Sequence, residues 1–212
     1  VLTDIVPTGT LNVGSTGSVQ VFAARTLKNQ GLLNNTGRIS ITQVSTLSNF
    51  GTLTNNGEIV DFLTIGANAQ IFRNEFGATL RNNGLLSFTT NIKPENLGTL
   101  INHGSLLVRV PMTNSGTLTL AAGSSFVYSG AVLTNSGTLS LAAGSLQLAA
   151  DQAALRCEQA DLLGTRLHLV AGTLKAVGSA LSTVFDRVLH HSRQHLRTTE
   201  GLDKVQAEQL VC

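Results

Sequence analysis

A short unit of sequence recurs along most of this chain and constrains its fold more than any other feature. The stretch MTNSGTLTLAAGS at residues 112–124 returns almost unchanged as LTNSGTLSLAAGS at residues 133–145. The shared unit reads Leu-x-Asn-x-Gly-x-Leu/Ile, and copies of it recur from Leu27 onward, often in head-to-tail pairs. The asparagines of corresponding copies are 20 or 21 residues apart. The repeat therefore predicts a chain that returns to the same lateral position about every twenty residues.

Within each unit, apolar and polar residues alternate. The segments TLTL, TLSL, RISI and SLQL have this period of two, which is typical of β-strands, and no helical stripe precedes about residue 150. Helical repeats need about 33 residues or more per unit. We therefore predict an all-β protein whose residues 1–178 form a parallel β-solenoid, a right-handed β-helix of about 20 residues per coil. Its leucines and isoleucines should point inward and stack on those of neighbouring coils.

The asparagines and glycines of the unit are predicted to form the corners of each coil. Glycine supplies positive φ at no steric cost, and asparagine tolerates the left-handed region. Stacked in register, the asparagine amides could also form a hydrogen-bonded ladder. The predicted corner residues are Asn29, Asn35, Asn49, Asn55, Asn82, Asn102, Asn114, Asn135, Gly31, Gly37, Gly51, Gly57, Gly84, Gly104, Gly116 and Gly137.

Two segments interrupt the repeat. The spacing from Asn55 to Asn82 is longer than the others, and TTNIKPEN from Thr89 to Asn96 matches no unit. We expect both to be loops that bulge from a corner. The threonine that follows each glycine should face outward on a strand. The threonines do not form a sustained Thr-x-Thr array in the sequence, so ice binding is not favoured.

The last part of the chain has a different character. Charged residues are 12% of the whole chain, yet seven basic and seven acidic residues lie in the last 62 positions. An apolar stripe at helical spacing follows there, formed by Leu181, Val184, Phe185, Val188, Leu189 and Leu196. We predict that residues 179–212 form a short α-helical cap over the last coil, with Leu202–Val211 as a second short helix. The alternative is that residues 179–212 join the chain into a homo-oligomer or bind a partner.

Composition argues against several classes of partner. A net charge of +2 with scattered basic residues does not favour nucleic acid, and no run of about 18 apolar residues predicts a membrane span. His190, His191 and His195 lack a third ligand, so no metal site, cofactor or catalytic residue is assigned. Cys157 and Cys212 could pair within the chain, pair between chains or remain free.

Glycan chemistry stays open as an alternative. Glycoside hydrolysis usually needs two carboxylates on one surface, and the solenoid offers Asp4, Glu58, Asp61, Glu75 and Glu95. Strand alternation would direct Glu58 and Asp61 to opposite faces. Basic residues recur near corners, which would suit an acidic glycan: Arg25, Lys28, Arg38, Arg73, Arg81 and Lys93.

The N-x-G-x-L units over residues 8–178 resemble the parallel β-helix of filamentous-haemagglutinin-like adhesins and autotransporter passenger domains. That resemblance implies an exported structural or adhesive surface and transfers no catalytic residue. We therefore expect a non-enzymatic solenoid of an extracellular surface, fibre or particle. Its expected partners are further copies of the chain, other surface proteins or glycans. The alternative is a carbohydrate-active β-helix protein. No secretory leader is visible at Val1, which a trimmed, exported product would also lack.

Overall fold

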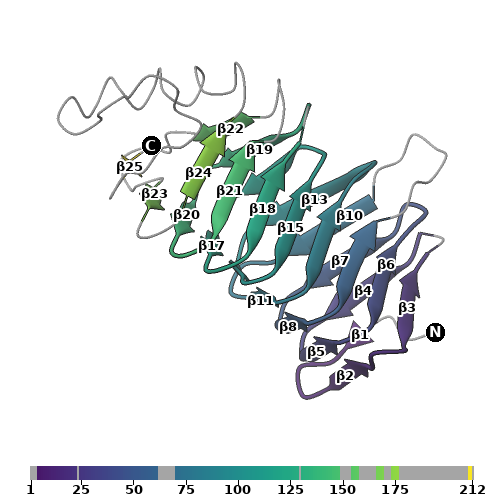
Figure 1. The fold of residues 1–212 in the computed structure, drawn as a ribbon. Helices are drawn as coiled ribbons and strands as arrows, with labels where there is room; N and C mark the ends of the chain where they lie inside the picture. The colour runs from purple at the N-terminus through teal and green to yellow at the C-terminus, as the bar shows by residue number, and fades with distance from the viewer. Residues whose placement is uncertain are drawn as a thin grey trace.

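The protein is a parallel β-solenoid. The computed structural model describes residues 4–22, 24–61, 70–128, 130–148, 154–157, 166–169, 173–176 and 210–211. In these residues the chain passes through three sheets in turn and then repeats the circuit (Figure 1). Strands β1 to β24 fall into eight successive triplets, and each triplet is one coil. The predicted all-β solenoid of about twenty residues per coil is confirmed.

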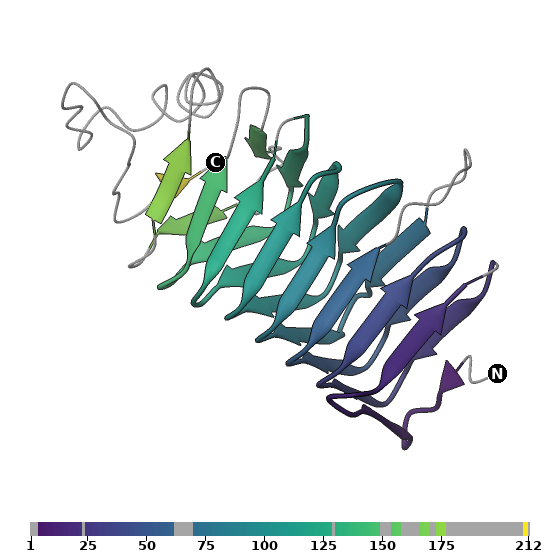
Figure 2. The ribbon, with the colours of Figure 1, turned by 45° about the vertical axis from the view of Figure 1, so that its right-hand side comes forward.

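The three sheets, here named A, B and C, each take one strand from every coil (Figure 2). Sheet A contains β1 (Asp4–Ile5), β4 (Thr26–Asn29), β7 (Thr46–Asn49), β10 (Gln70–Asn74), β13 (Ile92–Asn96), β16 (Met112–Asn114), β19 (Val132–Asn135) and β22 (Ala154–Cys157). Sheet B contains β2 (Thr10–Val13), β5 (Leu32–Asn35), β8 (Thr52–Asn55), β11 (Thr79–Asn82), β14 (Thr99–Asn102), β17 (Thr117–Leu120), β20 (Thr138–Leu141), β23 (Arg166–Leu169) and β25 (Leu210–Val211). Sheet C contains β3 (Ser18–Val21), β6 (Arg38–Ile41), β9 (Glu58–Asp61), β12 (Leu85–Phe88), β15 (Ser105–Val108), β18 (Ser124–Val127), β21 (Ser145–Leu148) and β24 (Thr173–Ala176).

The core is a set of columns of apolar side chains that run along the solenoid axis. In sheet B, for example, Leu33, Leu53, Leu80 and Leu100 stack in register and are fully buried. Burial alternates along most strands, with the leucine or isoleucine inside and its neighbours outside. A single coil cannot bury its apolar side chains by itself. Each coil therefore buries them against the coils above and below. The near-identical units at residues 112–145 are adjacent coils, paired through Leu118 and Leu139.

Two ladders of buried asparagine run inside the solenoid beside the apolar columns. Each ladder residue ends a strand, and its Nδ2 donates to the Oδ1 of the next asparagine along the axis. The ladder at the end of sheet A joins Asn29, Asn49, Asn74, Asn96, Asn114 and Asn135. The ladder at the end of sheet B joins Asn35, Asn55, Asn82 and Asn102. Hydrogen-bonded ladders were one predicted use of these asparagines, and the structure contains them.

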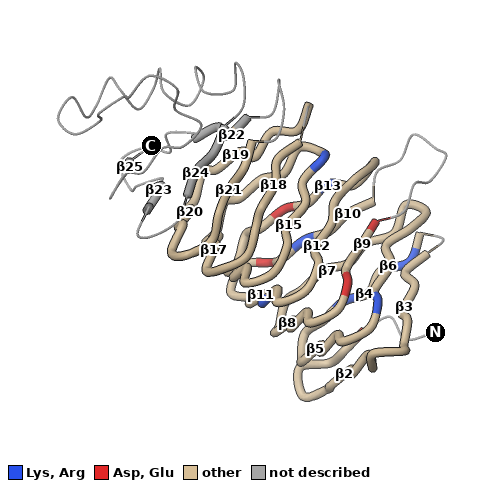
Figure 3. Tube along the Cα trace, viewed as in Figure 1, with Lys and Arg blue, Asp and Glu red and all other residues tan. Residues whose placement is uncertain are grey.

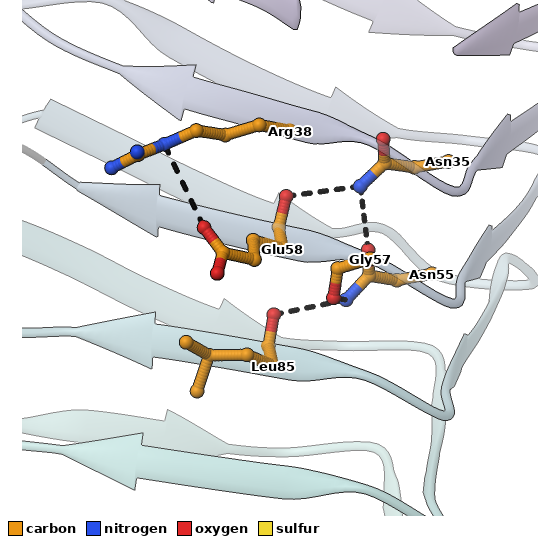
Figure 4. A network of polar contacts seen from close by, with 6 residues as sticks. All are labelled: Asn35, Arg38, Asn55, Gly57, Glu58 and Leu85. Carbon is orange, nitrogen blue, oxygen red and sulfur yellow. Dashed lines mark hydrogen bonds and ion pairs between the residues drawn. The ribbon is translucent and has the colours of Figure 1, made fainter. Parts of the chain in front are cut away.

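Ladder asparagines also tie a corner to the next coil, as Asn35 and Asn55 do in Figure 4. Asn35 Nδ2 donates to Asn55 Oδ1 at 2.7 Å and to the Glu58 carbonyl oxygen at 2.9 Å. Asn55 repeats the pattern with Asn82 Oδ1 at 2.7 Å and the Leu85 carbonyl oxygen at 2.9 Å. Since these amides are buried, the bonds offset a desolvation cost that would otherwise oppose folding.

The corner glycines are needed for a reason different from the one predicted. None of the eight predicted corner glycines has positive φ; in the described chain the glycines that do are Gly77, Gly123 and Gly130. A Cβ added at Gly116 would instead overlap the carbonyl oxygen of Gly98 in the preceding coil. The same overlap recurs between Gly137 and Gly116. Close approach between stacked corners, rather than left-handed backbone, therefore selects glycine.

The segment from Thr89 to Asn96 is not a bulging loop, as the sequence analysis expected. Residues 92–96 form strand β13, which pairs with β10, and Asn96 belongs to the sheet A ladder. Asn74 also belongs to that ladder, although NEFG does not fit the repeat unit because its corner is two residues longer. Of the longer spacing between Asn55 and Asn82, residues 62–69 lie outside the described chain.

The predicted helical cap over residues 179–212 lies almost entirely outside the described residues. Its two described residues, Leu210 and Val211, form strand β25, where a helix was expected. Strand β25 pairs antiparallel with β23 at the end of sheet B. One terminal strand edge is thus covered by a hydrogen-bonded strand, a common way to protect an exposed edge.

Candidate functional surfaces

The outward positions of the three sheets form three faces with different chemistry. Face A is the outer side of sheet A, and faces B and C are those of sheets B and C. Most described charges lie on the first five coils (Figure 3). No charged residue occurs between Arg109 and Asp151.

Face A carries an in-register column of charged and polar residues. The column runs through Asp4, Lys28, Ser48, Arg73 and Glu95 on successive coils. Arg73 Nε donates to Glu95 Oε2 at 2.6 Å. Its Nε also lies 3.9 Å from Glu75 Oε1. Face A is therefore the charged face of the described solenoid.

Face B is lined by hydroxyl groups. The first outward position of each strand forms a continuous column of threonine through Thr52, Thr79, Thr99, Thr117 and Thr138. The expectation that threonine faces outward is met at these positions. The two outward columns together do not form a sustained Thr-x-Thr array, as predicted. The second outward column is interrupted by Arg81 and Ile101.

Face C carries an apolar strip on its middle coils. Val60, Ser87, Leu107 and Phe126 form one outward column. Ser87 is only 6% exposed because it lies between larger neighbours. At the adjacent corner the Arg109 guanidinium lies 4.4 Å from the ring centroid of Tyr128, a distance that allows a cation–π contact.

Glu58 and Asp61 point in opposite directions from β9, as strand alternation predicted. Glu58 is exposed and lies near Arg38, with Oε2 3.8 Å from Arg38 Nε. Asp61 is buried and accepts hydrogen bonds from the backbone N–H groups of Thr89 and Thr90, each at 2.7 Å. Asp61 thus fixes the turn of the next coil, and the two carboxylates do not share a surface.

Glu75 and Glu95 are brought together through Arg73. Both carboxylates contact that guanidinium, so the three charged groups form one ion-pair cluster. A glycosidase acid typically lies in an apolar pocket, whereas these two carboxylates lie beside a cation. This arrangement suits binding or stabilisation better than proton donation.

The basic residues named in the sequence analysis lie on different sides of the solenoid. Lys28, Arg73 and Lys93 are on face A, Arg38 is on face C and Arg81 is on face B. Arg25 lies at the corner between sheets C and A. A polyanion laid along face A would meet Lys28, Arg73 and Lys93, with Arg25 at the edge of that face.

The histidines and cysteines form no clustered site among the described residues. His103 is exposed at the corner between β14 and β15. Among the residues whose placement is described, no three His, Cys, Asp or Glu side chains group closely enough to hold a metal ion. That part of the chain also contains no helix long and apolar enough to cross a bilayer. His190, His191, His195 and Cys212 lie outside the described residues, as does the side chain of Cys157.

These features define a parallel β-solenoid with two internal asparagine ladders and three chemically distinct faces. Residues 103–212 match the family described as protein of unknown function DUF3540. The match covers just over half of the chain, so the protein belongs to this family. It begins at the corner before β15 and therefore includes the near-identical coils at residues 112–145. No curated protein and no solved structure is significantly similar to the chain.

Proposed function

We propose that this protein is a non-enzymatic structural or adhesive β-solenoid of an extracellular surface, fibre or particle, of the adhesin-like type that its repeats resemble. The observation that supports the proposal is the use of its recurring polar residues. All ten ladder asparagines are buried, and nine of them donate a hydrogen bond to the next coil. These asparagines recur in successive coils and hold each coil on the next, which is what a rigid rod requires. A catalytic group, by contrast, is needed only once.

Location gives the first test of this proposal. Antibodies raised against the full chain should label intact cells or particles, and limited external proteolysis should remove that label. A chain that fractionates only with internal soluble proteins, and that external protease never reaches, would contradict the proposal. The control is a known internal protein followed in the same fractions.

A carbohydrate-active protein is the second candidate, and the cluster of Arg73, Glu75 and Glu95 on face A favours it over other enzymes. The test measures the release of reducing ends from a panel of neutral and acidic polysaccharides. We expect no release from the wild type. Release that disappears in Glu95→Gln or Glu75→Gln, but persists in Glu58→Gln on face C, would establish the enzyme and overturn the structural proposal.

A further inference from the structure

Two phenylalanines project into solvent from the corner between sheets A and B, on adjacent coils. Phe76 is 90% exposed and Phe50 is 45% exposed, and their coils are neighbours because β7 pairs with β10. We call Phe50 and Phe76 the aromatic ridge. Large aromatic side chains contribute most to protein interfaces when they become buried there. A ring that stays in water adds little to the stability of a monomer.

Folding does not require aromatic residues at this corner. Ser115 and Ser136 occupy the position of Phe50 in later coils and make the same backbone hydrogen bond to the preceding coil. Phe76 is the second residue of a four-residue turn closed by Ala78 N and Glu75 O at 3.0 Å, with Gly77 at φ 80. Such a turn needs glycine at its third position and accepts many residues at its second.

The charged column of face A borders the aromatic ridge. From coil one to coil five it reads Asp4, Lys28, Ser48, Arg73 and Glu95. The signs are therefore negative, positive, neutral, positive and negative. Lys28 Nζ lies 5.0 Å from the centroid of the Phe50 ring, so the column and the ridge are in contact. An occupant of the ridge must also match this order of charges.

A second copy of the chain satisfies both the ridge and this order of charges in one antiparallel register. When coil three of one chain faces coil four of the other, Phe50 lies opposite Phe76 of the partner subunit. Lys28 then lies opposite Glu95 of the partner subunit. Two-fold symmetry repeats both contacts, because an isologous interface uses the same patch on each subunit.

The neighbouring registers bring like charges together. With coil three facing coil three, Lys28 meets Arg73 of the partner subunit, and Asp4 meets Glu95 of the partner subunit. With coil four facing coil four, Arg73 meets Arg73 of the partner subunit. Like-charge contacts of this kind suppress incorrect docking. Among the antiparallel registers that bring two ridge phenylalanines together, only coil three facing coil four therefore pairs opposite charges.

A parallel pair lacks this complementarity. It would place face A of one copy against face B of the other across the ridge. The face B residues that border the corner on the first five coils are uncharged: Thr10, Leu32, Thr52, Thr79 and Thr99. Lys28 would then face no carboxylate of the second copy.

We propose that a second copy of this chain docks antiparallel along the corner between sheets A and B. Phe50 packs against Phe76 of the partner subunit, and Lys28 pairs with Glu95 of the partner subunit. The contact follows one corner of a narrow rod, so it is smaller than a standard interface and exchanges reversibly. Its ion pairs lie at the rim, and added salt should therefore weaken it.

Sedimentation equilibrium of the full chain over a range of concentrations and salt tests the proposal. The wild type should shift reversibly from monomer to dimer as concentration rises. Phe76→Ser should raise the dissociation constant about ten-fold or more, with an unchanged melting temperature because the ring is exposed. Lys93→Glu is the control for the Lys28→Glu variant described below. It makes the same charge change at another position of face A, and it should dimerise like the wild type.

A charge-swap mixture tests the register itself. Lys28→Glu alone and Glu95→Lys alone each place like charges at both symmetry-related contacts, so each variant should remain mainly monomeric. An equimolar mixture of the two restores opposite charges at both contacts and should recover the dimer mass. A wild type that stays monomeric at every concentration, a dimer insensitive to Phe76→Ser, or a mixture that fails to recover the dimer would each overturn the proposal.

Discussion

At the scale of single residues, the repeat unit divides its work between two kinds of contact with the neighbouring coil. The asparagine donates its side-chain amide forward, to the next asparagine and to a carbonyl oxygen beyond the corner. The glycine leaves room for a carbonyl oxygen of the coil before it. Both contacts lie between coils, so neither residue can be replaced without changing how two coils fit together.

Replacing Gly116 tests the close approach of corners. Gly116→Ala should lower the free energy of unfolding by about 1–3 kcal/mol, as overpacked sites do, and Gly116→Val should cost more. Gly14 is the matched control, because an added Cβ there meets nothing within 4 Å. Chemical denaturation monitored by circular dichroism gives both values. Equal stability of Gly14→Ala and Gly116→Ala would contradict the steric explanation.

Replacing Asn55 tests the ladder. In Asn55→Ala the buried Asn35 amide loses an acceptor and Asn82 Oδ1 loses its donor. Each unsatisfied buried group costs about 1–3 kcal/mol, so the variant should lose about 2–6 kcal/mol in urea denaturation. Asn56→Ala removes an exposed bond to Asn83 and should change stability by less than about 1 kcal/mol. A smaller loss in Asn55→Ala than in Asn56→Ala would refute the assignment.

Val44 has an unfavourable backbone for its type. It is β-branched and has φ 60 in the turn between β6 and β7. Left-handed backbone costs an L-residue about 1–2 kcal/mol, and asparagine tolerates it best after glycine. Val44→Asn and Val44→Gly should therefore raise the melting temperature. Val6→Asn, also exposed but without positive φ, serves as the control. Destabilisation by both Val44 variants would show that the side chain has a packing role.

At the scale of strands and turns, the ends of the ladders show how sheet B changes from polar to apolar. After Asn102 the next residue in register is Leu120, which cannot accept a hydrogen bond. Ser125 Oγ in the same coil accepts from Asn102 Nδ2 instead, at 3.2 Å. At the other end, Asn35 Oδ1 faces Val13 and has no partner among the described residues. Where the sheet B ladder ends, the last asparagine therefore depends on a residue of another strand for its hydrogen bond, or leaves an acceptor without a partner among the described residues.

Asp61 provides a prediction at this scale, because it joins the end of one strand to the turn of the next coil. In Asp61→Asn the side-chain NH₂ would meet the N–H groups of Thr89 or Thr90, which Asp61 now binds. Hydrogen bonds to charged groups contribute about 1.5–3 kcal/mol each, so we expect a loss of at least about 2 kcal/mol. Glu58→Gln on the same strand should change stability by less than about 1 kcal/mol. Thermal unfolding compares the two, and similar losses would disprove the anchoring role.

At the scale of the whole molecule, the solenoid is a stack whose stability is nearly a sum over coils and their interfaces. Coil length is variable, since ladder neighbours in sheet A are 18 to 25 residues apart. Extra residues are accommodated at corners, and strand register is preserved. This arrangement allows coils to be added or lost as units.

Deletion of one coil tests that modularity. Removing residues 112–132 joins Pro111 to Leu133, which is the register partner of Met112. The product should remain folded with slightly lower stability, as measured by circular dichroism and denaturation. Leu146 then stands where Ser125 was, so adding Leu146→Ser should restore an acceptor for Asn102 and regain stability. Removing residues 112–121 disrupts the register and should unfold the protein; a folded product would contradict the stacking account.

The sequence alone determined the class of fold, the coil length, the inward leucines and the outward threonines, because period-two alternation and a fixed repeat are local properties of a chain. It placed the corner asparagines and glycines but misjudged why glycine is needed. It also missed Asn74, and it expected a loop where β13 forms. These outcomes depend on which residue of one coil meets which residue of the next, and corners of unequal length set that registry. Only the stacked structure therefore decided that Asp61 anchors a turn and that Phe50, Phe76, Lys28 and Glu95 share one edge.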